Sequence, residues 1–504
     1  MHYRNCFICG ASVQGFHRFC NNCYNKKFRE NEVIYHKIRN EWRLEAKQES
    51  SEYFYFLNEA NDIFEGNKNM IIGRKGEGKT AIAKYIYSIK KHNIFTEKIS
   101  FQNFPFNRLY DTSDNQYTRP NQYISIWKFL TYSIICKQMI NNQNINSNIT
   151  NELRRIFPEA DNNKKLSDLI SEYKVKQFSL EFFGIGFNTS VEKKIGITWI
   201  QLIDVLEKII IANIDDAKYY ILFDELDEDY KSFHSIDEKT NYFDLITGLL
   251  KAVQDMRALF TENNLSVYPI VFLRSDIYNR ITYSDKNKWS DSIIKLTWTP
   301  EKLKALLKHR LNIVLERDDI SFKECWYHLF SDYKMSVGSP PHTKRIDTFD
   351  YILRSTQNRP RDFIKYFQEC VKVAIEGKYP FILPTVIKSA DSAFSEYMKN
   401  EITDEMYAVL PEYEDIFAIL SSIRKQTFKP FEFVDKYEQL VEEGQIPDRG
   451  AQAVLKLLFE FSVIGNVPAI KNQAIFKYEK DTARFNFREN IIVHRGLYKA
   501  LQIF

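Results

Sequence analysis

The chain has 504 residues, of which 44% are hydrophobic and 27% are charged, the balance of a folded protein rather than a disordered one. The formal net charge of +4 is small for this length and excludes a polycation that coats nucleic acid over its whole surface. No apolar run reaches the ~18–20 residues of a membrane span, and the start, MHYRNCFICG, lacks a signal-peptide core, so we expect a cytoplasmic protein without membrane contact.

Four of the seven cysteines lie close together near the start of the chain, in the pairs CFIC and CNNC: Cys6, Cys9, Cys20 and Cys23. Two such pairs joined by a short loop bring four thiolates around one point, which suits a structural Zn²⁺. Two disulfide bonds are the alternative, but nothing else in the sequence indicates an oxidising compartment. The pattern predicts a zinc ribbon over residues 1–30, with basic neighbours that suit contact with nucleic acid or with protein.

The next segments alternate between helical and strand-like patterns. Helical spacing of apolar residues predicts a helical linker over residues 31–60. The sequence then predicts the following strands and helices: strands at 70–73, 219–223 and 266–273, helices at 124–140 and 199–213, and a hairpin at 179–196. Strands that alternate with helices predict an α/β core with a parallel sheet over residues 61–297.

A glycine-rich loop, GRKGEGKT, follows the apolar run MIIG and precedes a helix. It fits the phosphate-loop pattern G-x-x-x-x-G-K-[ST] at every fixed position. Its glycines let backbone amides turn toward phosphate oxygens, its lysine supplies a charge for the β- and γ-phosphates, and its threonine offers a hydroxyl to Mg²⁺. We therefore expect ATP to be bound by the eight residues of the loop: Gly73, Arg74, Lys75, Gly76, Glu77, Gly78, Lys79 and Thr80.

The stretch YYILFDELDE supplies the acids that such a loop requires. Asp224, at the end of an apolar strand, is predicted to hold Mg²⁺ through water, and Glu225 to polarise an attacking water as general base. Asp227 is expected to be part of the loop only. The sequence has no N-K-x-D pattern for guanine, so a GTPase is disfavoured.

Two further motifs contribute arginines. In IVFLRSDI, Arg274 ends a strand and is placed where it can sense the γ-phosphate. In TQNRPRDF, Arg359 and Arg361 lie at the start of a later helix. We expect one of these two arginines to reach over the nucleotide as a lid arginine or to act on a neighbouring subunit.

The strand signals fade after about residue 298, and the helices that follow predict a helical lid over residues 298–403. Three helices at 404–424, 430–442 and 449–461 then precede β-like stretches at VIGNV, AIFKYE and ARFNFRE. This order predicts a winged-helix domain over residues 404–504. Its third helix carries few basic side chains, which favours protein contact over DNA reading.

These motifs together resemble the AAA+-related P-loop ATPases of the additional-strand, catalytic-glutamate class. More narrowly, they resemble bacterial members with FLRSDI after the sensor strand and RPRD in the lid, over about residues 50–500. The resemblance implies an α/β ATPase core, a helical lid, a C-terminal winged helix and a switch-like homo-oligomer. Many relatives lie in anti-phage defence loci, so the resemblance also implies a separate effector protein.

Two features depart from that class. The zinc ribbon is not a general part of it, and the segment between Lys79 and Asp224 is longer than a minimal core needs. We expect the insertion within 101–196 to be a surface for a partner or effector. The alternative function is a nucleic-acid-handling ATPase, such as an initiator, loader or transposition regulator, that contacts nucleic acid through the ribbon or the winged helix.

Overall fold

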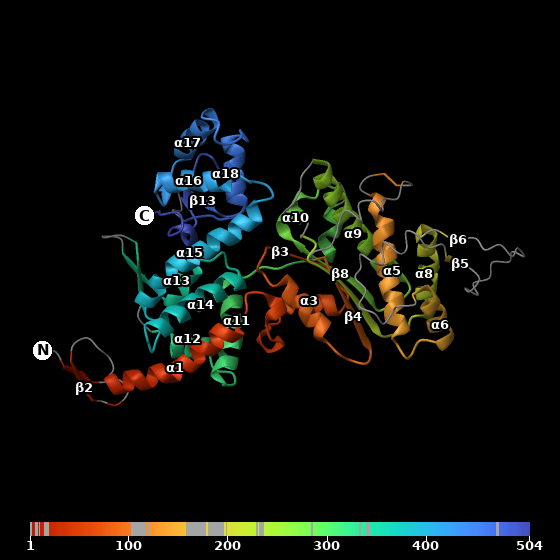
Figure 1. The fold of residues 1–504 in the computed structure, drawn as a ribbon, viewed down its shortest axis with the longest axis horizontal. Coiled ribbons are helices and arrows are strands. Elements are labelled where there is room, and N and C mark those ends of the chain that lie inside the picture. The colour runs from red at the N-terminus through yellow and green to blue at the C-terminus, as the bar shows by residue number, and fades with distance from the viewer. Residues whose placement is uncertain are drawn as a thin grey trace, which may run out of the picture. The chain divides into compact units, whose positions relative to one another are not determined.

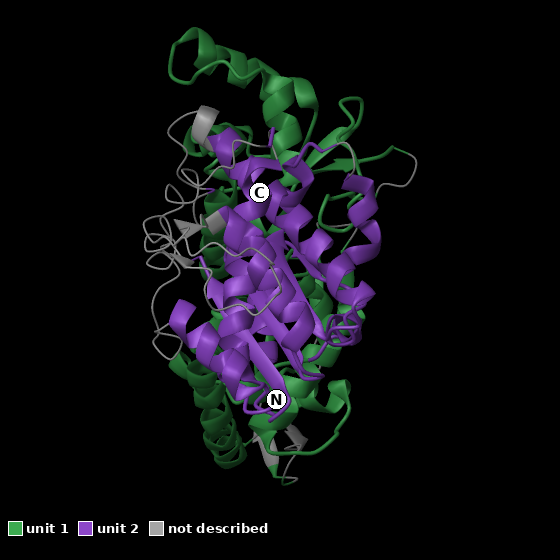
Figure 2. Ribbon diagram, turned by 90° about the vertical axis from the view of Figure 1, so that its right-hand side faces the viewer, with its two compact units in different colours: residues 1–55, 297–504 green, residues 56–296 purple. Residues whose placement is uncertain are grey.

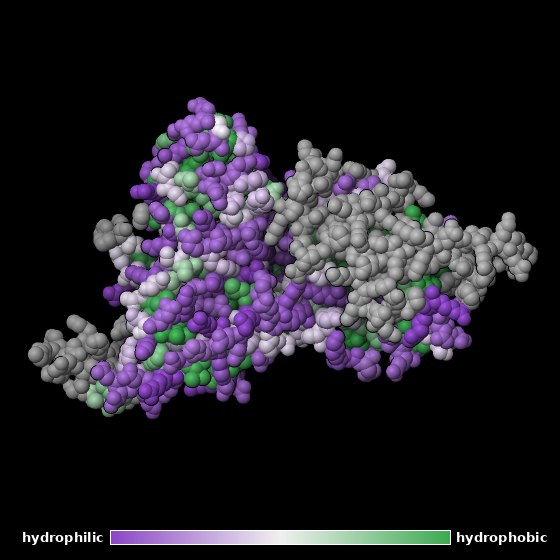
Figure 3. All heavy atoms as spheres, in the orientation of Figure 1, coloured by the Kyte–Doolittle hydropathy of each residue, from purple (hydrophilic) through white to green (hydrophobic). Residues whose placement is uncertain are grey.

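The structure is a computed structural model that describes residues 3–5, 9, 11–14, 20–101, 117–118, 121–157, 178–179, 196–197, 199–227, 230, 236–283, 286–331, 334–338, 343–469 and 473–503. The chain divides into two compact units (Figure 2), of which unit 1 comprises Met1–Tyr55 with Thr297–Phe504 and unit 2 comprises Phe56–Leu296. Among the described residues no helix is long and apolar enough to span a membrane. The coloured part of the surface in Figure 3 is mostly hydrophilic, with small separate apolar areas.

Unit 2 contains the predicted α/β core (Figure 1). Its strands are β3 (Met70–Gly73), β4 (Ile94–Ser100), β5 (Phe178–Ser179), β6 (Gly196–Ile197), β7 (Lys218–Asp224), β8 (Val267–Arg274) and β9 (Ile293–Lys295). Its helices are α2 (Asn61–Phe64), α3 (Lys79–Ser88), α5 (Ile124–Ile140), α6 (Ser147–Ile156), α8 (Trp199–Asn213), α9 (Ile236–Glu262) and α10 (Ser275–Arg280).

Five of these strands form one parallel sheet in the order β4-β7-β8-β3-β9. The inner strands are continuous apolar runs, as expected when helices cover both faces of a parallel sheet. On one face of β7, Phe223 contacts Trp127 of α5, and on the other face Tyr220 contacts Phe64 of α2. The predicted α/β fold class with its parallel sheet is confirmed, and β8 lies between the strand that enters the glycine-rich loop and the strand that ends at Asp224.

The helix at the centre of the predicted insertion is not a partner surface. Fourteen of the 17 residues of α5 are buried, because the helix packs against α8, α9, β4 and β7. A helix that is apolar all round is a core helix. For this helix the surface prediction was therefore wrong. Phe178 and Ser179 pair with Ile197 and Gly196 as the ends of the predicted hairpin, and residues 180–195 lie outside the described residues.

Unit 1 is mainly helical. Its helices are α1 (Asn21–Glu41), α11 (Pro300–Leu315), α12 (Phe322–Leu329), α13 (Thr348–Leu353), α14 (Pro360–Glu376), α15 (Pro384–Met406), α16 (Tyr413–Ile423), α17 (Pro430–Glu442) and α18 (Ala451–Glu460). Its short strands are β1 (Tyr3–Asn5), β2 (Ser12–Gln14), β10 (Met335–Val337), β11 (Lys344–Ile346), β12 (Thr427–Phe428), β13 (Ile464–Val467) and β14 (Asn490–Val493).

The N-terminal helix α1 is part of the helical unit rather than an isolated linker. It packs against α11 and α14, and Asn31 donates a hydrogen bond to the carbonyl of Pro380 at 2.6 Å. Beyond the helix, the buried ring of Trp42 lies 5.2 Å from that of Phe367. Apolar burial of this kind is the main stabilising term of such packing. The segment after the cysteine pairs therefore shares a core with the predicted lid.

The C-terminal part of unit 1 has three helices and a three-stranded antiparallel sheet in the order β12-β14-β13. The helix predicted at 404–424 is in fact two helices, because α15 ends at Met406 and α16 begins at Tyr413, with Pro411 between them. VIGNV contains β13, whereas AIFKYE contributes one bridge through Ile475 and ARFNFRE contributes no strand.

The side chain of Asn466 on β13 holds the ARFNFRE segment. Its amide nitrogen donates to the carbonyl of Asn486, and its amide oxygen accepts from the backbone nitrogen of Asn486, both at 2.9 Å. The backbone of Asn466 bonds Ile475 instead, so this contact with ARFNFRE is made by a side chain and not by a strand ladder. The winged-helix assignment stays a prediction that this element order suits.

Candidate functional site

The glycine-rich loop joins β3 to α3 and has the backbone geometry of a phosphate loop. Gly76 and Gly78 have positive φ angles of 82° and 98°, which glycine adopts at little cost. At Gly73 a Cβ atom would lie 3.0 Å from the Glu77 carboxylate and 3.2 Å from Leu296. The loop ends where α3 begins, so the amides at the helix N-terminus face the place where phosphate oxygens would lie.

Charged side chains form hydrogen bonds with other residues of the loop. The buried carboxylate of Glu77 accepts from the Arg74 backbone nitrogen at 2.6 Å and from its Nε at 2.8 Å. The Lys79 ammonium donates to the carbonyls of Gly73 and Arg74 at 2.9 and 3.0 Å. Burial lowers the pKa of Lys79, and nearby Asp227 and Glu77 oppose that shift. The lysine is thus held over the loop, where a phosphate would meet it.

The end of β7 brings Asp224 to the loop. Thr80 Oγ1 donates to Asp224 Oδ1 at 3.5 Å, and the ammonium of Lys98 on β4 lies 2.8 Å from Asp224 Oδ2. Burial raises the pKa of Asp224, and the charge of Lys98 opposes that shift. A hydroxyl and a carboxylate are the hard oxygen donors that Mg²⁺ prefers. Thr80 and Asp224 therefore fit the predicted magnesium site.

Glu225 follows directly and has an unusual backbone. Its φ angle is 62°, in the left-handed region that residues other than glycine rarely adopt. Ser100, the last residue of β4, donates a hydrogen bond to Glu225 Oε2. A strained backbone of this kind is more frequent at functional sites than elsewhere. The carboxylate of Glu225 is thus held at the carboxyl edge of the sheet, next to Asp224.

Arg274, at the end of β8, is 3% exposed and is held by two carboxylates. Its Nε and Nη2 donate to Asp276 at 3.0 and 2.8 Å, and its Nη1 donates to Asp227 at 3.1 Å. Burial would raise the pKa of Asp227, but Arg274 and Lys79 beside it keep that pKa below its ordinary value. Asp227 is therefore more than a loop residue, because it contributes to the site.

Arg359 and Arg361 lie in unit 1, where each forms an ion pair with a glutamate. Arg359 is 3% exposed, forms an ion pair with Glu405 and donates a hydrogen bond to Gln357. Arg361 lies 3.2 Å from Glu45 and 3.4 Å from Glu401. These contacts favour a structural role for Arg359 at the start of α14. The catalytic role of either arginine stays a prediction.

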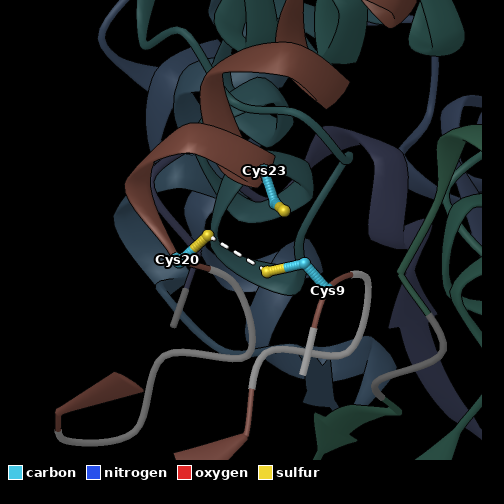
Figure 4. Close-up of side chains that lie close together, drawn as sticks. All are labelled: Cys9, Cys20 and Cys23. Atoms are coloured by element: carbon cyan, nitrogen blue, oxygen red, sulfur yellow. Dashed lines mark hydrogen bonds between the residues drawn. The ribbon is translucent and has the colours of Figure 1, made fainter. Parts of the chain in front are cut away.

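The cysteine cluster lies at the start of α1 in unit 1. The sulfur atoms of Cys9, Cys20 and Cys23 lie within 4.8 Å of one another and point toward one another (Figure 4). The sulfurs of Cys9 and Cys20 are 3.6 Å apart, and no disulfide joins any two of these three residues. Cys6 lies outside the described residues. Three converging thiols fit a structural metal site better than a disulfide pair.

Four polar residues at this site were not predicted from the sequence to belong to it: Lys98, Ser100, Asp227 and Asp276. The first two lie on β4, whose sequence IFTEKIS has three consecutive polar residues and no apolar/polar alternation, so it was not predicted as a strand. Asp276 stands within the motif FLRSDI, two residues after Arg274, so its spacing from the arginine could have identified it.

The similarity of this chain to known proteins is distant or covers only part of the chain. Residues 301–403 match the family described as FunZ-associated C-terminal helical domain. No curated protein matches the chain. Among solved structures, the Aeropyrum pernix ORC2 protein in ADPNP–ADP complexes is 13% identical, with a TM-score of 0.36 and coverage of 87% of each chain.

Two other solved structures are similar to the chain. The Aeropyrum pernix ORC1 protein in complex with DNA is 9% identical, with a TM-score of 0.33 and coverage of 95% of this chain and 91% of that one. Cdc6p from Pyrobaculum aerophilum is 12% identical, with a TM-score of 0.29 and coverage of 94% and 92%. TM-scores this low do not support an inference about function. The parallel sheet and its glycine-rich loop themselves define the class, an α/β fold with a phosphate loop.

Proposed function

We propose that this protein is a magnesium-dependent ATPase that acts as a nucleotide-controlled switch. The observation that carries this proposal is the convergence of loop, acids and arginine at one edge of the parallel sheet. Thr80 lies 3.5 Å from Asp224, and Arg274 lies on the next strand beside Asp227. Ligands of open α/β sheets bind outside the carboxyl ends of the strands, which is where these side chains lie.

Each residue has a role that follows from its position. Loop amides and Lys79 bind the phosphates, and Thr80 and Asp224 hold Mg²⁺, directly or through water. The metal, when bound, neutralises charge on the phosphate oxygens. Glu225 orients and polarises the attacking water. Arg274 keeps a fixed guanidinium near the γ-phosphate, because Asp276 binds two of its nitrogens.

Unit 1 supplies the parts through which a switch would act on other molecules. We propose that nucleotide occupancy orders the helical lid and that a homo-oligomer or a separate effector protein responds. The match of residues 301–403 to a family of helical domains supports the assignment of this segment as the helical lid. A role in anti-phage defence is expected from the resemblance of the sequence motifs to those of bacterial P-loop ATPases found in defence loci.

A nucleic-acid-handling ATPase is the second candidate. The observation that favours it is a set of exposed basic side chains on α1: Lys26 and Arg29 lie in the first turns after the cysteine cluster, and Arg39 lies in the last turn. Helix α18, the third helix of the C-terminal module, exposes Gln452, Ala453, Lys456 and Glu460 instead, which is a poor surface for reading bases. We therefore place any nucleic-acid contact at the N-terminal end rather than at α18.

Nucleotide binding tests the proposal directly. Lys79→Ala is expected to weaken ATP binding at least about 100-fold, because the loop loses the charge that meets the phosphates. The measurement is an equilibrium titration with a fluorescent ATP analogue in the presence of Mg²⁺. Lys90→Ala, which removes an exposed lysine two residues after the end of α3, is the matched control. Equal affinities for wild type and Lys79→Ala would contradict the proposal.

We also propose that the cysteine cluster holds Zn²⁺. Protein purified under reducing conditions is expected to contain about one Zn²⁺ per chain, and Cys20→Ser to lose most of it, because serine is a poor zinc ligand. Metal analysis of the purified chains gives the content. Cys325→Ser is the control, since Cys325 is buried and donates to Asn312 Oδ1 away from the cluster. Full zinc content in Cys20→Ser would exclude the site.

A further inference from the structure

A lysine contacts the proposed magnesium residue. The ammonium of Lys98 lies 2.8 Å from Asp224 Oδ2, and the two side chains are 14% and 3% exposed. The other carboxylate oxygen, Oδ1, accepts from Thr80. Lys98 is thus the ion-pair partner of one carboxylate oxygen, and Thr80 is the hydrogen-bond donor to the other. The role of Lys98 rests on the proposed function, in which Asp224 binds Mg²⁺.

The sheet fixes this contact. In the parallel ladder between β4 and β7, Lys98 is paired with Leu222 and Ser100 with Asp224. Alternate residues of a strand point to the same face, so Lys98 and Ser100 project from one face of β4. The long stem of Lys98 reaches along the strands to Asp224, while Ser100 bonds Glu225. One edge strand thus contacts both acids of the site.

The energetics of a buried carboxylate show what this lysine does. A buried charge without a partner costs several kcal/mol, and this cost is offset when an opposite charge lies within bonding distance. Two cations on one carboxylate repel each other, and more strongly in a buried site than in water. Mg²⁺ in such sites is commonly bound by one or two carboxylates together with substrate phosphates. A metal that approaches Asp224 must therefore compete with Lys98.

We propose that Lys98 is a built-in counter-cation of Asp224 that makes metal binding depend on nucleotide. Lys98 satisfies the carboxylate when Mg²⁺ is not bound and so lowers the affinity of the site for the free metal. Phosphate oxygens that arrive with the nucleotide supply the extra negative charge that lets Mg²⁺ share Asp224 with, or displace, the ammonium. Lys98 is a positioning residue in this account, because it acts through Asp224 and not on the substrate.

A measurement of metal affinity in the absence of nucleotide distinguishes this role of Lys98 from that of a purely structural ion pair. The probe is Mn²⁺ in place of Mg²⁺, with free Mn²⁺ followed by electron paramagnetic resonance. Lys98→Gln removes the charge but keeps a hydrogen-bond donor for Asp224, and is expected to bind Mn²⁺ at least about tenfold more tightly than wild type. Lys98→Arg keeps the charge and is expected to bind no more tightly than wild type.

The matched control is Lys128→Gln. Lys128 forms an ion pair with Asp255 at 3.3 Å in the same unit, so the substitution removes a lysine–aspartate pair away from the phosphate loop and should leave Mn²⁺ affinity unchanged. Equal Mn²⁺ affinities, within about twofold, for wild type and Lys98→Gln would overturn the role of Lys98. If Lys98→Gln does not fold, Lys98→Met, which removes the charge but keeps much of the side-chain length, takes its place. Tighter Mn²⁺ binding by the methionine variant supports the proposal, and binding within about twofold of wild type overturns it.

The same preparations separate the two proposals. ATP binding is measured beside Mn²⁺ binding in wild type and Lys98→Gln. If wild type binds no ATP, the proposed function fails, whatever the metal titrations show. If wild type binds ATP normally and the Mn²⁺ affinity does not respond to Lys98→Gln, the ATPase proposal stands and the role of Lys98 is rejected.

Discussion

Glu225→Gln is expected to lower ATP turnover by about 10²- to 10⁴-fold, the range that a positioned general base contributes, while ATP affinity changes little. The glutamine keeps the shape of the side chain and can still accept a hydrogen bond from Ser100. It cannot polarise water as a carboxylate does. The measurement is steady-state phosphate release, with ATP binding titrated on the same samples.

The matched control is Glu97→Gln. Glu97 is an exposed residue of β4 whose side chain alternates to the face opposite that of Lys98 and Ser100, so its replacement should leave turnover near that of wild type. Turnover that is equal in wild type and Glu225→Gln would reject the role of Glu225. Loss of turnover together with loss of ATP binding would instead indicate that Glu225 supports the fold of the site.

Arg359→Ala is expected to destabilise the protein by about 3–5 kcal/mol, since it leaves a buried carboxylate without its partner. Arg359 and Glu405 are 3% and 6% exposed, and the guanidinium also bonds Gln357. Gln357 in turn donates to the carbonyl of Phe461 at 3.1 Å. Chemical denaturation of wild type and variant gives the difference in the free energy of unfolding.

The double variant Arg359→Met with Glu405→Met tests the cause of that loss. It removes both charges and fills much of their volume, so it is expected to recover a large part of the lost stability. The outcome that would contradict the structural role is an Arg359→Ala protein that unfolds like wild type but hydrolyses no ATP. That result would instead support a role for Arg359 as a lid arginine.

The sequence predicted the centre of the fold because its signals are local there. The strand MIIG, the glycine-rich loop and the helix after it occupy β3, the phosphate loop and α3 as expected. Helices 124–140 and 199–213 were predicted with the bounds that α5 and α8 have. Long apolar patterns of this kind are set by neighbours in sequence.

Contacts between distant segments were less predictable. Lys98 meets Asp224 only because β4 pairs with β7, and the edge strand β4 is too polar to stand out as a strand. Arg359 and Arg361 were the two candidates for a lid arginine, and the sequence did not predict that Arg359 forms an ion pair with Glu405 on the next helix, α15. A motif identifies the residue type, whereas the partner depends on tertiary packing. Such cases mark the limit of reasoning from local pattern.

Single-turnover ATP hydrolysis shows most directly whether this chain is an ATPase. Purified wild type in excess over radiolabelled ATP is incubated with Mg²⁺, alone and with DNA or RNA, beside Lys79→Ala. Wild type is expected to convert the bound ATP to ADP in Mg²⁺, whereas Lys79→Ala and samples with a chelator are not. Stimulation by DNA or RNA would favour the nucleic-acid-handling candidate over a switch that acts on a protein. ATP recovered intact from wild type in every condition would contradict the claim that this chain is an ATPase.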